Sequence, residues 1–193
     1  LYGGGYAEFA ACGTGAVARI PPNMPFDEAA ALPLAGSTAL QSLRDHAHLQ
    51  EGARVLVNGA SGGVGAFAVQ IAVAYGATVT GVASGPLEDV ARSTGAADFL
   101  NYLQEKFTRL DRQWDVIFDA AGKSSYAEVK PILAHEGRYV STEPSLRGLV
   151  VSLLTWPLDK KGSVMLAHSR SKDLQELLRL YEAGQLKVAV AET

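Results

Sequence analysis

The stretch Arg54-Val55-Leu56-Val57-Asn58-Gly59-Ala60-Ser61-Gly62-Gly63-Val64-Gly65 decides the fold that we expect for this chain. The apolar run Arg54–Asn58 leads directly into glycines, which is typical of a buried parallel strand. After the turn, Gly62–Tyr75 has apolar residues at helical spacing and is stopped by Gly76. The sequence therefore predicts a strand, a tight turn and a helix in immediate succession.

The same alternation continues on both sides of this unit. We expect further helices at Asp27–Leu49, Leu87–Thr94, Ser125–Ala134 and Lys172–Glu182. Asp27 is the expected N-cap of the first, and Pro33 is expected to break or kink it. We expect further strands at Thr78–Ala83, Asp98–Leu100, Asp115–Asp119, Arg138–Ser141, Ser163–Ala167 and Leu186–Val190. Strands that alternate with helices predict an α/β protein with a doubly wound parallel sheet, and Thr142–Gly162 should be a loop with some helix.

The first residues have a different pattern. Tyr6–Cys12 and Val17–Ile20 are short extended segments, closed by Pro21-Pro22. No leader or capping residue comes before them, so we expect the chain to begin inside a larger unit.

Composition limits the kinds of partner. The net charge is −3, from 17 basic and 20 acidic residues, and the basic residues are scattered, which argues against a nucleic-acid partner. The single cysteine, Cys12, cannot form an internal disulfide, and no Cys/His cluster has the spacing of a zinc site. No apolar stretch is long enough to cross a bilayer. We expect a cytoplasmic protein with no membrane partner.

The glycine-rich turn carries the chemistry. In G-x-G-x-x-G the first glycine is replaced by Ala60, and Gly62 and Gly65 supply the other two. Gly62 leaves room for a pyrophosphate, Gly65 lets helix and strand pack closely, and the helix N-terminus attracts the anion. After the next predicted strand comes Ser84, where an NAD-binding protein would have a carboxylate. A small hydroxyl there does not repel a 2′-phosphate, so NADPH is the expected cofactor.

Four motifs together resemble one family. They are Gly5–Phe9, Ala29–Ala39, Asn58–Gly65 and Gly95–Tyr102, and their order and spacing are similar to those of the quinone-oxidoreductase branch of the medium-chain dehydrogenase/reductase superfamily. The resemblance covers nearly the whole chain. It implies that residues 1–26 are the last strands of a GroES-like catalytic domain and that residues 27–193 are a Rossmann NADP-binding domain.

The resemblance also assigns residues to parts of the cofactor. It implies that Ser61, Gly62, Gly63 and Val64 line the pyrophosphate. By the same comparison Ser84 and Tyr102 reach the adenosine phosphate, and Ala121 and Gly122 border the ribose. Ser141 should lie near the nicotinamide, and Thr38 should form a hydrogen bond at that end.

The resemblance further implies zinc-independent hydride transfer. Zinc-dependent relatives have a metal-binding cysteine four residues before the threonine, and this chain has Leu34 there. The expected activity is therefore NADPH-dependent reduction of a quinone or an enone, with no metal. The isolated chain should only bind the cofactor, because most of the catalytic domain is expected to precede it.

Two other functions remain open: the enoyl-reductase domain of a larger synthase, and a non-catalytic NADPH-binding sensor or interaction module. Tyr126 and Lys130 match the Y-x-x-x-K pair of short-chain dehydrogenases, but no serine lies at the upstream position that such enzymes need, so we interpret the match as coincidence. The apolar segment Ser163–Ala167 has no charge or proline and should form an edge strand. We expect a homodimer through that edge.

Overall fold

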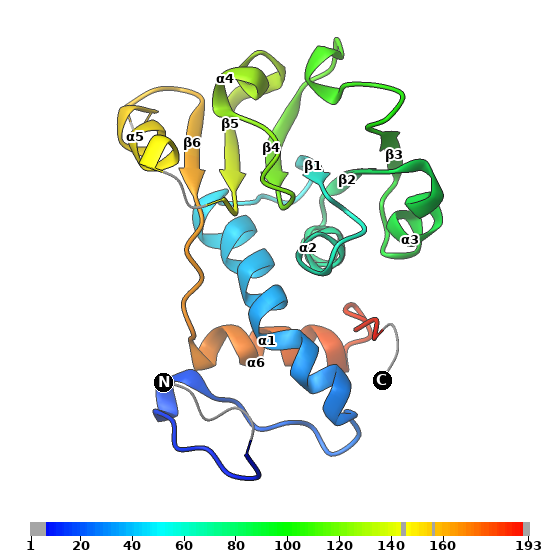
Figure 1. Cartoon of the computed structure of the whole chain (residues 1–193), viewed down its shortest axis with the longest axis vertical. Coiled ribbons are helices and arrows are strands. Elements are labelled where there is room, and N and C mark those ends of the chain that lie inside the picture. Colours follow the sequence, from blue (N-terminus) through cyan, green and yellow to red (C-terminus); the bar gives the residue numbers. More distant parts are fainter. Residues whose placement is uncertain (1–6, 144–145, 156, 191–193) are drawn as a thin grey trace.

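The computed structural model describes residues 7–143, 146–155 and 157–190 (Figure 1). Six strands form one all-parallel sheet in the order β3-β2-β1-β4-β5-β6. The strands are β1 (Arg54–Asn58), β2 (Thr78–Ala83), β3 (Asp98–Asn101), β4 (Trp114–Asp119), β5 (Leu133–Ser141) and β6 (Lys161–Val164). The order reverses between β1 and β4, so the predicted doubly wound α/β fold is confirmed.

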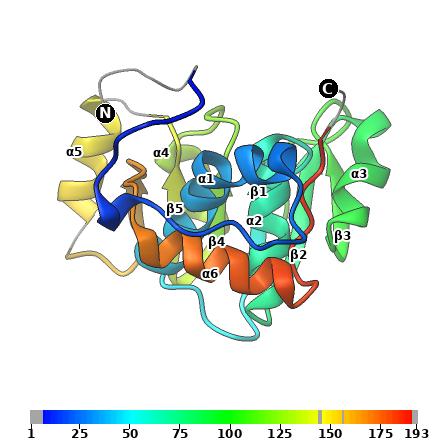
Figure 2. The same cartoon turned by 90° about the horizontal axis from the view of Figure 1, so that it is seen from below.

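Helices cover both faces of the sheet. The α-helices are α1 (Phe26–Gln41), α2 (Gly63–Ala74), α3 (Glu88–Ser93), α4 (Tyr126–Val129), α5 (Leu146–Thr155) and α6 (Ser171–Glu182). Helices α1 and α2 pack on one face, with α6 lying across α1, whereas α4 and α5 belong to the other (Figures 1 and 2). Within the described residues, none of the helices has the length and apolar character needed to span a membrane.

The central strands contribute side chains to two separate cores, one on each face of the sheet. On β1, Val55 and Val57 belong to the cluster under α1 and α2, whereas Leu56 belongs to the cluster with Trp114 and Tyr139 on the other face. All three β1 side chains are fully buried. Burial on both faces explains why the strand has a continuous apolar sequence.

Helix α1 corrects two sequence-based expectations. It begins at Phe26 with Pro25 as N-cap, and Asp27 instead accepts a hydrogen bond from the Glu28 amide (2.9 Å). It also continues through Pro33 without a break. Proline removes one N–H, a loss that packing can offset, because Leu32 and Leu40 on either side are both buried in the core. A five-residue π-helix, Ser42–His46, then extends the helical run.

The expected strands near the two termini do not form. From Ala7 to Pro25 the only regular element is a short 3₁₀ helix, Thr14–Ala16, and Tyr6 lies outside the described residues. Segment Leu186–Val190 is also not a strand. Gln70 of α2 holds it instead, donating to the Lys187 carbonyl (3.1 Å) and accepting from its amide (2.7 Å). Both predictions were wrong because apolar alternation does not show whether a neighbouring strand is available for pairing.

The bounds of β5, α4 and β6 also differ from those that the sequence predicted. Strand β5 begins at Leu133 rather than 138, and its register against β4 shifts between Trp114 and Val116. Helix α4 ends at Val129 and a 3₁₀ turn containing Pro131 follows, so the predicted helix 125–134 was too long. Strand β6 spans Lys161–Val164 rather than 163–167.

Strand β6 is the outer strand, as expected, but part of its edge is already occupied. The Thr155 hydroxyl of α5 accepts from the Gly162 amide (2.9 Å) and lies 3.2 Å from the Gly162 carbonyl oxygen. A second copy of the chain could therefore pair only with the edge beyond Gly162. The homodimer stays a prediction.

Candidate cofactor-binding site

A cavity of about 610 Å³ lies where strands β1, β2 and β4 end. It brings together four of the residues selected from the sequence, namely Ser61, Ser84, Tyr102 and Ala121. The carboxyl ends of β1 and β4 are the point at which the strand order reverses, which is the usual ligand position in an open parallel sheet. The candidate site therefore lies at the edge of the sheet where this type of fold usually binds its ligand.

The glycine-rich turn borders this cavity through Gly59 and Ser61, whereas the predicted residues Gly62, Gly63 and Val64 follow directly in the chain and are not among its lining residues. Helix α2 begins at Gly63, and its N-cap Gly62 has extended backbone angles and no side chain to satisfy the first amides. A Cβ at Gly63 would meet no heavy atom within 4 Å, and one at Gly62 would only touch the Gly59 carbonyl oxygen at 3.4 Å. The turn therefore leaves open space over free N–H groups, the arrangement that holds a phosphate.

Gly65 allows helix α2 to pack closely against the turn. A Cβ at this residue would lie 1.9 Å from the Gly59 carbonyl oxygen and 2.7 Å from its carbon. Gly59 itself has φ +87°, a conformation that favours glycine. The close approach of helix and turn that the sequence pattern predicted is present.

The end of β2 places Ser84 and Tyr102 beside each other. Ser84 directly follows the strand. The Tyr102 amide donates to the carbonyl of Ala83, the last residue of β2 (3.1 Å). Both side chains reach solvent, with Tyr102 53% exposed. Two exposed lysines, Lys106 and Lys123, line the same cavity and were not selected from the sequence. They come from loops whose sequence gives no periodic signal.

Charges of both signs meet at this cavity. Glu105 and Glu128 line it together with the two lysines. Glu128 is already engaged, because its carboxylate accepts from the Ser125 amide (2.9 Å) and hydroxyl (2.6 Å) in the capping box of α4. These hydrogen bonds hold the pKa of Glu128 below its usual value. The lysines are the cationic groups available to an anionic ligand in this cavity.

A polar cluster that was not predicted from the sequence lies beneath the site. Asp119 ends β4 and is fully buried, and its carboxylate accepts from Asn58 Nδ2 (2.8 Å) and from the Ser124 amide (2.7 Å). The Tyr139 hydroxyl donates to the Ser124 carbonyl (2.6 Å) and lies 3.3 Å from Asp119 Oδ2. Burial, followed by the negative charge of Asp119, raises the pKa of Tyr139. We call Asn58, Asp119, Ser124 and Tyr139 the Asp119 cluster.

The remaining predicted residues lie around or away from the cavity. Ser141 lines a second cavity of about 610 Å³ between the ends of β5 and β6, and Ser124 borders both cavities. Gly122 has φ +62° in the loop after β4. Thr38 lines neither cavity: it is buried in α1, where its hydroxyl donates to the Leu34 carbonyl (2.7 Å).

Tyr126 and Lys130 do not form a catalytic pair. The Tyr126 hydroxyl donates to the Lys160 carbonyl (2.7 Å), and burial raises the pKa of this phenol. The carbonyl of Lys130 accepts from Lys160 Nζ (3.1 Å). The tyrosine therefore ties α4 to the start of β6, in agreement with our interpretation of the motif as coincidence.

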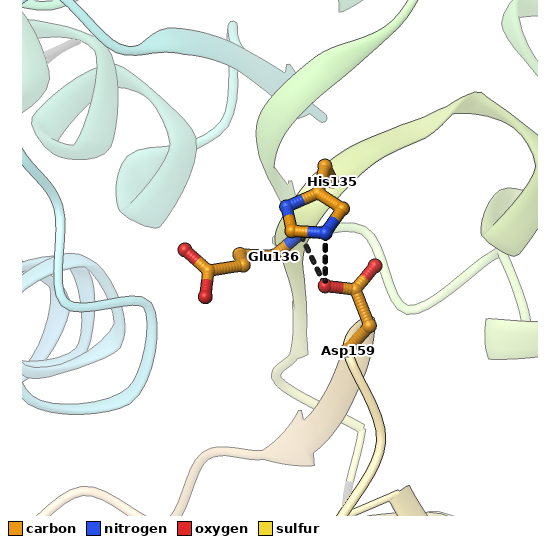
Figure 3. Close-up of side chains that lie close together, drawn as sticks. All are labelled: His135, Glu136 and Asp159. Atoms are coloured by element: carbon orange, nitrogen blue, oxygen red, sulfur yellow. Dashed lines mark hydrogen bonds and ion pairs between the residues drawn. The ribbon is translucent and has the colours of Figure 1, made fainter.

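Two features of the described residues bear on zinc binding. Leu34, at the position of the metal-binding cysteine in zinc-dependent relatives, is apolar and 76% exposed. One potential ligand group exists in the described part of the chain, formed by His135, Glu136 and Asp159 (Figure 3). All three are exposed, their potential ligand atoms lie within 4.8 Å of one another, and His135 Nε2 lies 3.3 Å from Asp159 Oδ1. This surface group does not resemble the closed ligand set of a structural zinc site.

Comparisons with known proteins agree with this architecture. A family model described as zinc-binding dehydrogenase matches residues 94–193. A chloroplast envelope quinone oxidoreductase homolog from Arabidopsis thaliana is 30% identical over 203 residues, which is 98% of this chain and 61% of that protein. The polyketide synthase GfsB from Streptomyces halstedii is 38% identical over 143 residues, which is 72% of this chain and 2% of that protein.

Solved structures give the same answer. The quinone oxidoreductase from Coxiella burnetii has a TM-score of 0.74 and 29% identity, covering 84% of this chain and 51% of its own. The chain thus spans about half to three fifths of these quinone-oxidoreductase relatives. The sheet order, the glycine-rich turn and these matches lead to one conclusion: the chain belongs to the zinc-binding dehydrogenase family and is a quinone-oxidoreductase-like member of the medium-chain dehydrogenase/reductase superfamily.

Proposed function

We propose that this chain is the NADPH-binding part of an oxidoreductase that transfers hydride to a quinone or to an activated C=C bond. The observation that carries the proposal is the cavity at the ends of β1, β2 and β4, which joins the open glycine-rich turn to Ser84 and Tyr102. A dinucleotide needs such a continuous path from phosphate to adenosine.

The residues fit the cofactor in three respects. The α2 amides over Gly62 and Gly63 would hold the pyrophosphate, since no side chain fills the space above them. Ser84 and Tyr102 would face the adenosine ribose. Ala121 and Gly122 would border the ribose further along, with Ser141 and Thr38 toward the nicotinamide. The Thr38 hydroxyl proton is engaged with Leu34, so this side chain would act as an acceptor for a carboxamide N–H.

The preference for NADPH follows from the charges near Ser84. No carboxylate occupies that position, and Lys106 and Lys123 line the same cavity. A ribose 2′-phosphate at Ser84 would therefore meet a hydroxyl in a cavity whose cationic groups are Lys106 and Lys123, beside the carboxylates of Glu105 and Glu128. NADH would lack the carboxylate that binds its 2′-hydroxyl.

The nicotinamide would supply the hydride, and the protein would place it against the substrate and exclude water. We propose that this transfer needs no zinc, because the position that a zinc-dependent relative uses as ligand is Leu34 here. Carbonyl charge that develops on the substrate would then be stabilised by hydrogen-bond donors rather than by a metal.

A second candidate is an enoyl-reductase domain within a larger synthase. The 38% identity to the polyketide synthase GfsB favours it. Both candidates use the same cofactor site, and they differ in the substrate: a free quinone or enone in the first, an enoyl chain carried as a thioester in the second.

The test of the cofactor assignment is calorimetric titration of NADPH and NADH into the wild-type chain and Ser84→Asp. We expect the wild type to prefer NADPH by about 1.4–2.8 kcal/mol, roughly ten- to a hundredfold. The aspartate should repel the 2′-phosphate and accept from the 2′-hydroxyl, so the preference should reverse. Ser93→Asp, on the exposed end of α3, is the matched control and should leave the preference unchanged. Tighter NADH binding by the wild type would refute the assignment.

A further inference from the structure

Asp119 is a buried charge without a counter-ion. Its side chain is fully buried, and in the described part of the chain no ion pair joins it to a basic residue. Hydrogen bonds from Asn58 and from the Ser124 amide satisfy its two oxygens. Such a group adds little net stability compared with an apolar side chain of similar size, so its value lies in the geometry that it imposes.

That geometry concerns the loop 120–124 after β4. At its start, the amides of Ala120 and Ala121 both donate to the Asn58 carbonyl (3.0 and 3.2 Å). At its end, the amide of Ser124 is held by Asp119 and its carbonyl by Tyr139 (2.7 and 2.6 Å). The Asp119 cluster therefore fixes both ends of the loop to β1, β4 and β5.

The same loop forms one wall of the candidate site. Ala121, Lys123 and Ser124 line the cavity. Ala121 also packs against the glycine-rich turn, since its amide nitrogen and Cβ both lie 3.2 Å from where a Cβ of Gly59 would be. A shift of this loop would change the distance between the phosphate-binding turn and the wall beside it.

We propose that Asp119 is a positioning residue for nucleotide binding: it holds residues 120–124 in the binding conformation before the ligand arrives, without touching the ligand. This role rests on the proposed function, since it presumes that the cavity takes a nucleotide. It predicts that loss of the charge weakens nucleotide binding by more than general destabilisation of the fold can explain.

The experiment compares Asp119→Asn with Asp173→Asn. Asp173 is the matched control, because it is also fully buried and accepts from Gln41 (2.6 Å) and Arg44 (2.7 Å), but at the contact of α1 with α6. NADPH and adenosine 2′,5′-bisphosphate are titrated into each variant under conditions where it is fully folded. We expect Asp119→Asn to weaken both ligands at least about tenfold, and Asp173→Asn to change them by less than about twofold.

A second measurement follows the loop directly. Amide hydrogen exchange without ligand should be faster at Ser124 in Asp119→Asn than in wild type, and unchanged in Asp173→Asn. If Asp119→Asn does not fold, Tyr139→Phe removes only the hydroxyl that holds the Ser124 carbonyl, and the same loss of affinity and protection is expected in smaller measure.

The outcomes separate the two proposals. If the wild type binds neither nucleotide, the proposed function fails and the positioning role fails with it. If the wild type binds NADPH but Asp119→Asn binds it equally well, or Asp173→Asn loses as much affinity, the positioning role alone is overturned.

Discussion

The two edges of the sheet each carry a cavity of nearly the same size, about 610 Å³ at the carboxyl ends of β1, β2 and β4 and about 630 Å³ at the amino ends of β1, β4 and β6. The first is built around an open helix N-terminus and the buried Asp119 cluster. The second is lined by exposed groups such as Glu51, His135 and Asp159. Cavity volume therefore does not distinguish the candidate binding site from the other cavity, whereas the open helix N-terminus and the buried polar cluster beside it do.

Some of the charged groups at the amino edge are engaged with one another. Asp115 pairs with Arg54 (2.9 Å), and His135 and the Glu136 amide both contact Asp159 (3.3 and 3.0 Å). Exposed pairs of this kind contribute little free energy. Neither the helix N-terminus of α2 nor the buried Asp119 cluster borders this cavity. We therefore expect substitutions at the carboxyl edge to change binding or folding strongly, and substitutions at the amino edge to change little.

The largest effect is expected at Gly65. Gly65→Ala places a Cβ 1.9 Å from the Gly59 carbonyl oxygen, so the turn and α2 must separate. We expect a loss of about 3 kcal/mol in the free energy of unfolding, measured by urea titration. Gly63→Ala is the control: its Cβ has no neighbour within 4 Å, and it should keep or slightly raise stability. Equal stability of the two variants would contradict the close approach.

Gly62→Val should separate binding from folding. Its Cβ makes only an ordinary contact at 3.4 Å, so the variant should fold, but the branched side chain occupies the space above the α2 amides. We expect NADPH affinity to fall by at least about a hundredfold in calorimetry. Gly13→Val, which also has open surroundings, should bind as wild type does. A folded Gly62→Val chain that binds NADPH normally would move the phosphate site elsewhere.

The contrast between the edges also explains what the sequence could predict. The turn around Gly62 and Gly65 was found because strand, glycines and helix follow one another along the chain. The Asp119 cluster was not found, because Asn58, Ser124 and Tyr139 meet Asp119 only after β1, β4 and β5 lie side by side. A site made of consecutive residues can be predicted from their types and spacing. A site made of residues on different strands depends on the register between those strands, which a single sequence does not show.

Errors in the fold have a similar origin. Pro33 was expected to break or kink α1, but the helix continues through it, with Leu32 and Leu40 buried in the core. Leu186–Val190 was expected as a strand, but Gln70 provides the partners that a neighbouring strand would have offered. In both segments, contacts with distant parts of the chain determined the secondary structure.

The smallest effect is expected at Asp115 on the amino edge. The Arg54 side chain holds the pKa of this carboxyl below its usual value of about 3.9, so the pair stabilises the fold above that pH and loses its effect as the pH falls further. Because both side chains are well exposed, Asp115→Asn should cost less than about 1 kcal/mol at pH 7 in urea titration. The difference from wild type should shrink as the pH falls and the Asp115 carboxylate becomes protonated, and NADPH affinity should not change. A difference that grows on acidification would show that another group is responsible.

The most direct test of the comparison is amide hydrogen exchange of the wild-type chain with and without saturating NADPH. We predict new protection at residues 59–65, 84–87 and 120–124, which surround the cavity at the carboxyl edge, and none at residues 47–53, 135–138 and 157–161, which surround the cavity at the amino edge. Protection confined to the amino edge, or no protection at the glycine-rich turn, would contradict the account.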